Sequence, residues 1–425
     1  MNSRRQVLNA DLEVRQNKIS KIAKNIKPTK DHQVIDATDQ FVTPGLIQNH
    51  VHLVQMLARG YADDMKLLDW LKKRIWPMES HHTDSTIAAS ADIGLFEMQL
   101  LGTTTILDMG TTHRHDVIFE QVEKSGMRYI GGKCLMDLKE FSGPLFEPME
   151  KGLRQTEQLI KKWHKKTSLL EYAICPRFAV SCSNQLLLAC NDLQKQYEVY
   201  THTHASESLE EIAIIQNRTG KKNVEYLASL GLLNPKTVIV HGVHLTKKEQ
   251  NLLHKYKAPL VHCPSSNLKL ASGIAPIEIY SGRITLGLGA DGAPCNNTMD
   301  PFIEMRLSAL LQKPKFGPEA FPAIKALELA TCEGAKVIGK QEQIGSLEVG
   351  KLADIITIDR SHPSVCTIQD PYSAIVYSAS GRDVKNVIID GQIVVKNKQH
   401  QIYDLQTIQQ QSKMATKKIT KKMLF

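Results

Sequence analysis

The stretch 45-GLIQNHVHL-53 decides the fold that the sequence predicts. It is a short apolar run of the length of a buried strand, and its end carries His50 and His52. Side chains at positions i and i+2 leave a strand on the same face, so both imidazoles can point to one place. Such a pair is weak evidence by itself. Its meaning depends on the rest of the chain.

Similar apolar runs follow at roughly regular intervals. Together with the first they occupy residues 45–53, 103–109, 128–136, 170–180, 198–204, 237–243, 259–263 and 284–289. Amphipathic segments that suit helices lie between most of them, for example 84–101, 147–166, 184–196 and 246–257. This alternation predicts an α/β fold, either a closed (β/α)₈ TIM-like barrel or a doubly wound open sheet. Periodicity leaves the choice between them open.

The segments on either side of this region have a different pattern. Residues 11–42 and 345–395 alternate short strands with turns, and IGSLEVGKLADIITID and KNVIIDGQIVV look like hairpin strands. Two such segments can pair into one small β-sandwich beside the barrel. The expected units are a sandwich from residues 1–43 and 344–400, a metal-dependent barrel from 44–343, and a C-terminal tail from 401–425 that is either a helix or partly disordered.

The composition is that of a globular enzyme, with 42% hydrophobic and 23% charged residues. No window offers about 20 uncharged apolar residues, and the start lacks the apolar segment of a secretion signal, so we expect a cytoplasmic protein without a membrane span. The eight cysteines form no CxxC pair and are expected to be reduced thiols. The net charge of +9 is spread along the chain without an aromatic-interleaved basic motif, so we expect no nucleic-acid partner.

Metal-binding residue types close two other predicted strands. The fifth run ends in His202 and His204, and the eighth is followed by Asp291. The C-terminal ends of barrel strands converge on one site, which favours the barrel over the open sheet. A shell of imidazoles and one carboxylate suits Zn²⁺, or alternatively Fe²⁺ or Mn²⁺, with one position left for water. The predicted ligands are His50, His52, His204 and Asp291.

The pattern alone does not separate His202 from His204, because the two share a face. We choose His204, which lies nearer the strand end and three residues before an acid, and assign His202 to the core or to support of the site. A second metal usually requires a bridging group such as a modified lysine on the fourth strand. Residues 169–180 contain no lysine, so a single metal ion is expected.

The same strand ends supply groups for hydrolysis. A divalent cation lowers the pKa of bound water to about 7, and Asp291 can accept the proton of that water. Glu207 is predicted to shuttle the proton to a ring nitrogen and then to the departing amine, although it also fits a surface acid at a helix start. His241, which ends the sixth run, is predicted to stabilise the oxygen of the tetrahedral intermediate. The pair His81 and His82 is expected at the surface.

The chain resembles the amidohydrolase superfamily over nearly its whole length. The resemblance rests on PGLIQNHVHL, RGYADDMKLLDWLKKRIWPME, GTTTILDM, HASES, VHCPSSNLKLASGIAP, GLGADGAPCNN and GSLEVGKLADIITID, which occur in the family's order. The branch it is most similar to contains methylthioadenosine/S-adenosylhomocysteine deaminases, 5'-deoxyadenosine deaminases, guanine deaminases and triazine hydrolases. The resemblance implies the same four metal ligands, Glu207 as proton shuttle and His241 as a residue that contacts substrate or hydroxide.

The resemblance gives two indications of the substrate. Glu79 matches the acid that holds the ribose hydroxyls in the nucleoside deaminases, and Trp70 and Trp76 are candidates for walls around an aromatic ring. These residues favour an adenosine-type nucleoside such as 5'-deoxyadenosine, methylthioadenosine or S-adenosylhomocysteine. In contrast, Arg177 and Phe178 match the PRF segment with which guanine deaminases grip the purine, where nucleoside deaminases commonly carry histidine. Guanine or a pterin is therefore the alternative substrate.

Two other functions fit the same fold. A triazine-type chlorohydrolase would release chloride, but retention of Glu207 favours departure of an amine, which needs protonation more than chloride does. A metal-free barrel that serves as an assembly scaffold should have lost ligands, and this chain has all four. The sequence thus predicts a hydrolytic aminohydrolase with a small-molecule substrate, and relatives suggest a homo-oligomer, either a dimer or a tetramer.

Overall fold

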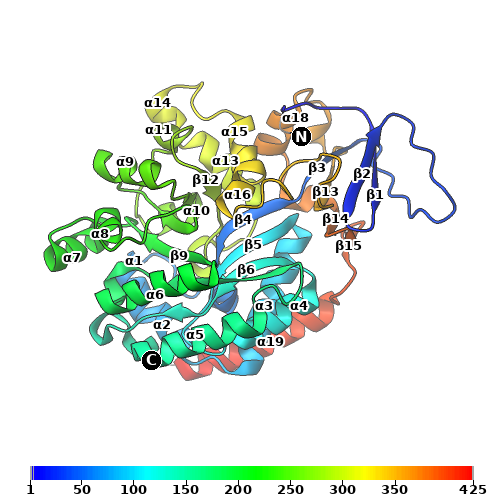
Figure 1. Ribbon diagram of the computed structural model, residues 1–425. Helices are drawn as coiled ribbons and strands as arrows, with labels where there is room; N and C mark the ends of the chain where they lie inside the picture. Colours follow the sequence, from blue (N-terminus) through cyan, green and yellow to red (C-terminus); the bar gives the residue numbers. More distant parts are fainter. Residues whose placement is uncertain (1, 3, 424–425) are drawn as a thin grey trace.

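A parallel sheet forms the centre of the molecule (Figure 1). The computed structural model describes residues 2 and 4–423 of the chain. Its strands are β4 (Leu46–Val51), β5 (Thr103–Met109), β6 (Arg128–Gly132), β7 (Cys134–Leu135), β8 (Leu170–Pro176), β9 (Tyr200–Ala205), β10 (Thr237–His241), β11 (Leu260–His262) and β12 (Leu286–Leu288). They pair in the order β12-β11-β10-β9-β8-β6-β5-β4, and β7 pairs with β8. Each strand coincides with one of the predicted apolar runs, and β9 extends one residue beyond its run, to Ala205.

The sheet closes between its first and last strands. Val51 and Asp291 form an isolated parallel bridge, and the backbone N–H of Asp291 donates to the carbonyl of His50 over 3.1 Å. β5 is buried at every position, which a strand covered on both faces requires. The predicted barrel is therefore confirmed, and the open sheet is excluded.

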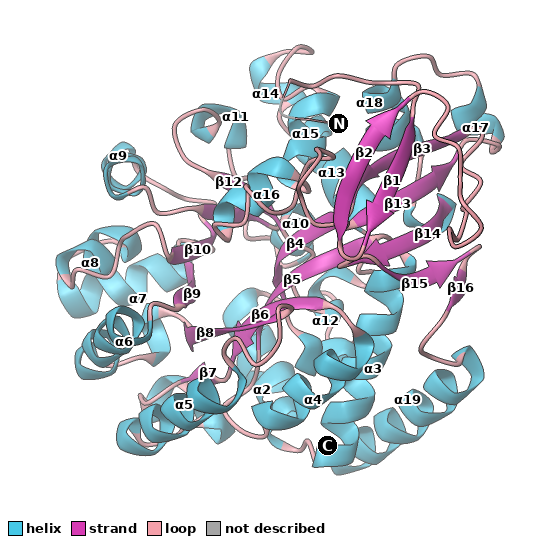
Figure 2. Cartoon of the chain, turned by 45° about the vertical axis from the view of Figure 1, so that its right-hand side comes forward, coloured by secondary structure: helices cyan, strands magenta, loops and turns pink. Residues whose placement is uncertain are grey.

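Helices surround the ring of strands (Figure 2). They are α1 (Leu67–Trp70), α2 (Trp76–Ser80), α3 (Asp84–Leu100), α4 (His115–Ser125), α5 (Met149–Trp163), α6 (Asn184–Tyr197), α7 (Leu209–Thr219), α8 (Asn223–Ser229), α9 (Lys247–Tyr256), α10 (Pro264–Lys269), α11 (Ile277–Tyr280), α12 (Ala293–Asn296), α13 (Pro301–Leu310), α14 (Lys313–Phe316), α15 (Ala323–Leu329) and α16 (Cys332–Val337). The predicted helical segments correspond to α3, α5, α6 and α9. None of the helices in the described part of the chain has the length and apolar character needed to cross a membrane.

A smaller β-structure flanks the barrel. It is built from the segments before and after the barrel in the sequence, as the sequence predicts. Its strands are β1 (Asp11–Arg15), β2 (Lys18–Ala23), β3 (Gln40–Pro44), β13 (Ile355–Asp359), β14 (Val384–Ile389), β15 (Gln392–Lys396) and β16 (Gln399–His400). β3 pairs with β13 in an antiparallel sheet, and the hairpin β1–β2 packs on it through Ile19, Ala353 and Ile355. The exact unit boundaries stay a prediction, and residues 1, 3, 424 and 425 of those units lie outside the described part.

The predicted tail contains a long helix. After α17 (Pro363–Cys366) and α18 (Pro371–Ser373), the chain passes through the small sheet and ends in α19 (Leu405–Thr420), which lies beside α3 in both views (Figures 1 and 2). Ile408, Ala415 and Ile419 are buried on one face of α19. Of the two alternatives for the tail, the helix is therefore the one observed over these residues.

Candidate metal and catalytic site

Four side chains converge at the C-terminal end of the barrel. His50 and His52 come from β4, His204 from β9, and Asp291 follows β12. Each offers one ligand atom, and these four atoms lie within 4.8 Å of one another. Asp291 Oδ1 is 3.2 Å from His50 Nε2 and 3.3 Å from His52 Nε2, and His204 Nε2 is 3.2 Å from His50 Nε2. The structure thus brings together the four residues that the sequence selects.

Hydrogen bonds behind the histidines turn their Nε2 atoms toward the centre. His52 Nδ1 donates to the carbonyl of Met109 over 2.7 Å, and His204 Nδ1 donates to the carbonyl of Arg177 over 2.7 Å. His50 Nδ1 lies 2.9 Å from His202 Nε2. Outer contacts of this kind fix the tautomer of a metal-binding imidazole. His202 therefore supports the site from behind, as one of the sequence alternatives suggests.

The electrostatics of the cluster also fit a cation. Burial lowers the pKa of His50 to about 3, against the opposing effect of Asp291, and burial holds the pKa of His204 well below its usual value. Although burial opposes ionisation of Asp291, the neighbouring His50 and His52 hold the pKa of this carboxyl well below its ordinary value. Neutral imidazoles and an ionised carboxylate are the forms that bind a divalent metal.

Asp291 is held in an unusual backbone conformation. Its φ of 64° lies in the left-handed region, which non-glycine residues seldom adopt. Oδ1 accepts the N–H of Gly292 over 2.8 Å, and Oδ2 accepts the hydroxyl of Ser266 over 2.6 Å. These bonds aim the carboxylate at the histidines and stabilise the strained geometry.

Glu207 and His241 lie beside the cluster. Glu207 Oε2 is 3.4 Å from His241 Nε2, and Ser272 donates to Glu207 Oε1 over 3.3 Å. His241 Nδ1 lies 2.9 Å from Asn267 Oδ1. Burial and then the nearby Asp291 raise the pKa of Glu207 to about 8. Glu207 is 4% exposed, which excludes the alternative of a surface acid.

A pocket opens directly onto these groups. Its lining residues are His52, Gln55, Leu67, Trp70, Leu71, Arg177, Phe178, His204, Glu207, His241, Leu270 and Asp291. Leucine and aromatic side chains supply the apolar wall that suits a flat heterocycle. Of the predicted substrate contacts, Trp70, Arg177, Phe178 and His241 are among the lining residues, whereas Trp76 and Glu79 are not.

Glu79 lies behind the pocket wall in an ion pair. Its carboxylate is fully buried and lies 3.3 Å from Arg177 Nη1, and Gln55 Nε2 donates to it over 2.9 Å. Gln55 Oε1 is buried without a hydrogen-bond partner. Sequence reasoning missed Gln55, although its position three residues after His52 on a site-forming segment was the available signal. His82 was also misjudged, since it is 3% exposed and bonds to the carbonyl of Val54.

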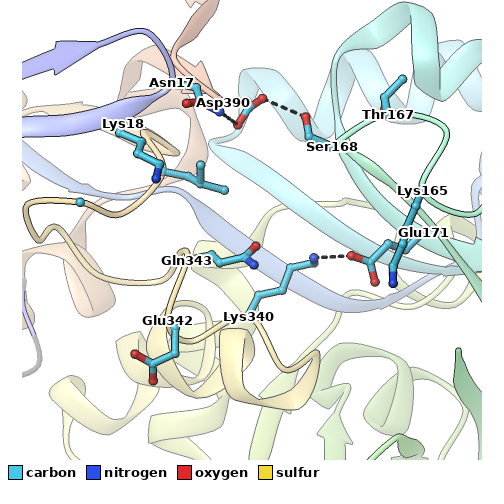
Figure 3. A pocket seen from close by; sticks show the side chains of 12 residues that line it. Asn17, Lys18, Lys165, Thr167, Ser168, Glu171, Lys340, Glu342, Gln343 and Asp390 are labelled. Atoms are coloured by element: carbon cyan, nitrogen blue, oxygen red, sulfur yellow. Dashed lines mark hydrogen bonds and ion pairs between the residues drawn. The ribbon is translucent and has the colours of Figure 1, made fainter. Parts of the chain in front are cut away.

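A larger cleft of about 520 Å³ lies at the opposite end of the barrel, next to the small sheet (Figure 3). Five of its polar side chains bond to one another. Lys340 pairs with Glu171, and Asp390 accepts bonds from Asn17 and Ser168. Catalytic groups of a barrel lie at the C-terminal ends of the strands. The smaller pocket is therefore the candidate active site.

Comparison with known proteins agrees with this assignment. A protein from Bacillus cereus named 5-methylthioadenosine/S-adenosylhomocysteine deaminase is 40% identical over 370 residues, which cover 86% of this chain and 84% of the relative. The crystal structure of an adenosine deaminase from Xanthomonas campestris with bound zinc superposes with a TM-score of 0.90 at 27% identity, covering 98% of this chain and 94% of that one. E. coli guanine deaminase gives a TM-score of 0.84 at 27% identity, with 91% and 92% covered.

The sequence model of the amidohydrolase family matches residues 41–394, which include every strand of the barrel and every residue of the four-ligand cluster. This match and the Bacillus cereus relative extend over most of the chain. The chain belongs to the amidohydrolase family.

Proposed function

We propose that this protein is a hydrolytic deaminase that releases ammonia from an adenosine-type nucleoside, with 5'-deoxyadenosine, methylthioadenosine and S-adenosylhomocysteine as the first candidates. The proposal rests mainly on the buried cluster of three imidazoles and one carboxylate beside a pocket that has both polar groups and an apolar wall of leucine and aromatic side chains. The name of the Bacillus cereus relative supports the substrate class. The reaction is hydrolysis of a C–N bond.

In this proposal, His50, His52, His204 and Asp291 hold one divalent ion, for which zinc is the first candidate and iron or manganese the alternatives. When bound, the ion supplies the Lewis acidity that makes hydroxide available near neutral pH. The donor set fits this role, because the imidazoles are oriented by the bonds behind them and burial lowers the pKa of His50 and His204, which keeps these two rings neutral.

Glu207 transfers protons to the substrate, and His241 stabilises the oxygen of the intermediate. Because burial raises the pKa of Glu207, the carboxyl retains a proton near neutral pH that it can donate to a ring nitrogen. Addition of hydroxide to the amino-bearing carbon gives a tetrahedral intermediate whose oxygen His241 stabilises. Asp291 takes the proton from the attacking water and passes it to Glu207, which by then has given its own proton to the ring nitrogen. Glu207 protonates the amine, the C–N bond breaks and ammonia leaves. The hydroxyl proton of the intermediate returns to Glu207 as the carbonyl forms.

The pocket also favours a second candidate substrate, guanine or a pterin. The guanidinium of Arg177 lies in the pocket wall, and Gln55 Oε1 has no partner there. A donor and an acceptor at one wall suit a ring that carries both a carbonyl and an N–H group. In this reading Glu79 balances the charge of Arg177 from its place behind the pocket wall, whereas the nucleoside reading requires Glu79 to reach the ribose hydroxyls from outside the pocket lining.

An ammonia-release screen separates these candidates. The purified, zinc-loaded protein is assayed with the three nucleosides, guanine and a pterin, and with a chlorotriazine for chloride release. We expect the highest kcat/KM with one of the nucleosides. Activity on guanine or the pterin without activity on nucleosides would replace the first candidate by the second. Metal analysis showing well under one equivalent, with no activity gained from zinc, manganese or iron, would overturn the enzymatic proposal.

We also propose that the protein is cytoplasmic and assembles as a homo-oligomer, either a dimer or a tetramer. Light scattering coupled to size-exclusion chromatography measures the assembly, and cell fractionation measures the location. The proposed unit division stays at residues 43/44 and 343/344, with the tail from residue 401.

A further inference from the structure

A buried carboxylate outside the pocket joins the two segments that hold Asp291. Glu304 lies on α13 and is 1% exposed. Its Oε2 accepts the N–H of Ser265 over 3.1 Å, and its Oε1 accepts the Ser265 hydroxyl. The same Oε1 accepts Nδ2 of Asn296 over 2.9 Å. Glu304 thus binds the start of α10 and the end of α12 at once.

Both of these segments act on Asp291. Ser266, the neighbour of Ser265 in α10, donates its hydroxyl to Asp291 Oδ2 over 2.6 Å. Asn296, at the end of α12, donates to the carbonyl of Ala290 over 2.8 Å, so it also holds the residue before Asp291. One route from Glu304 therefore reaches the Asp291 carboxylate through the peptide bond between Ser265 and Ser266, and the other reaches the backbone before Asp291 through Asn296.

Asp291 requires such restraint. Its left-handed φ of 64° is held by the surrounding structure rather than by local preference. A relaxed backbone at this point would move a ligand atom that lies 3.2 Å from His50 Nε2 and 3.3 Å from His52 Nε2. Metal affinity depends on ligands that are held in place before the metal binds.

The position of Glu304 is costly for packing alone. A carboxyl buried among neighbours is destabilised relative to water unless it is hydrogen-bonded, and an apolar residue of similar volume would fill the same space. Burial raises the pKa of Glu304 to about 7, while the bonds from Ser265 and Asn296 oppose this rise. An apolar side chain would fill this space at a lower cost in free energy. The hydrogen bonds are therefore what a carboxyl supplies here and an apolar side chain does not.

We propose that Glu304 is a positioning residue for the metal ligand Asp291, acting through Ser265–Ser266 and Asn296. This inference rests on the proposed metal site. Glu304 is neither one of the four ligands nor one of the pocket-lining residues, so we expect its effect on metal affinity and coordination geometry. Replacement by glutamine sets an amide N–H against a donor in either orientation of the amide, either the N–H of Ser265 or Nδ2 of Asn296, and so removes a bond to α10 or to α12.

Glu249 provides a matched control. It is fully buried and also accepts three hydrogen bonds, from the N–H and hydroxyl of Thr246 over 2.9 Å each and from the N–H of Val224 over 3.0 Å. These bonds join α8 and α9 and lead to none of the four ligands. Glu249→Gln therefore measures the cost of losing a buried carboxylate without disturbing Asp291.

The test compares the wild-type chain, Glu304→Gln and Glu249→Gln. Zinc affinity is measured by competition with a chromophoric chelator, the coordination geometry by the visible spectrum of the cobalt(II) forms, and folding by denaturant titration of the metal-free proteins. We expect Glu304→Gln to lose about ten-fold in zinc affinity, the lower end of the effect of outer-shell changes, with an altered cobalt spectrum. Glu249→Gln should keep both at the wild-type values while losing stability.

Wild-type affinity and spectrum in Glu304→Gln would overturn the inference and leave the proposed function intact. Failure of the wild-type chain to bind zinc, cobalt, manganese or iron would overturn both. Should Glu304→Gln not fold, Ser265→Ala takes its place, because it removes the hydroxyl bond to Glu304 and leaves the carboxyl in position. Unchanged zinc affinity in that variant would equally contradict the inference.

Discussion

At the scale of single residues, a substitution of Glu207 distinguishes a role in catalysis from a role in metal binding. Its carboxyl lies 3.4 Å from His241 Nε2 and does not belong to the four-ligand cluster. We predict that Glu207→Gln keeps the wild-type zinc content and loses at least about 100-fold in kcat, because the amide cannot carry a proton to the ring nitrogen and the amine. Metal analysis and ammonia release measure the two quantities.

The matched control is Glu210→Gln. It changes an exposed acid in the first turn of α7, the helix that follows Glu207 in the chain. It should leave both quantities at wild-type values. Turnover in Glu207→Gln close to that of the wild type would remove Glu207 from the mechanism and leave the metal site as the only supported part.

Sequence patterns could select the four-ligand cluster because each member ends a strand of a barrel. They could not separate His202 from His204, since only the orientation of neighbouring rings distinguishes them. Gln55 and Glu304 escaped the sequence reasoning for a different reason. Their roles depend on loops and short helices whose conformation no periodic pattern encodes.

At the scale of elements, one buried ion pair ties the barrel to the small sheet. Arg128, at the start of β6, donates to both carboxylate oxygens of Asp354 over 2.8 and 3.0 Å, and to Asp390 over 3.3 Å. Its side chain is 1% exposed. We predict that Arg128→Met lowers the free energy of unfolding by about 3–5 kcal/mol, because Asp354 is left buried without its partner.

Denaturant titration measures this loss. The double variant Arg128→Met with Asp354→Leu should recover a large part of it, since both charges are then absent. As a control, Lys73→Met breaks the exposed pair with Asp69 and should change the free energy by less than about 1 kcal/mol. A loss in Arg128→Met no larger than in this control would contradict the assigned link.

The barrel strands could be predicted because burial on both faces makes them continuous apolar runs. β14 and β15 could be predicted because Asp390 and Gly391 form the turn between them with positive φ values of 50° and 80°. The structure of the C-terminal tail could not be predicted from the sequence. Residues 401–425 are polar enough to suit disorder, and their helix is stabilised by a surface of α3 that is distant in sequence.

At the scale of the whole molecule, α19 packs against the barrel and holds the last part of the described chain there. Its buried residues Ile408, Ala415 and Ile419 face α3, and Tyr403, just before it, donates to Asp92 of α3 over 3.1 Å. The exposed remainder of α19 carries lysines. The helix therefore depends on tertiary packing rather than on its own propensity.

This dependence gives a prediction within one helix. Ile408 is 3% exposed and Met414 is 66% exposed. We predict that Ile408→Ala lowers the free energy of unfolding by about 2–5 kcal/mol through a cavity against the barrel, whereas Met414→Ala changes it by less than about 0.5 kcal/mol. Denaturant titration measures both variants. Zinc affinity should be unchanged in each, because α19 contributes none of the four ligands. Equal effects at the two positions would mean that α19 does not stabilise the barrel through this face.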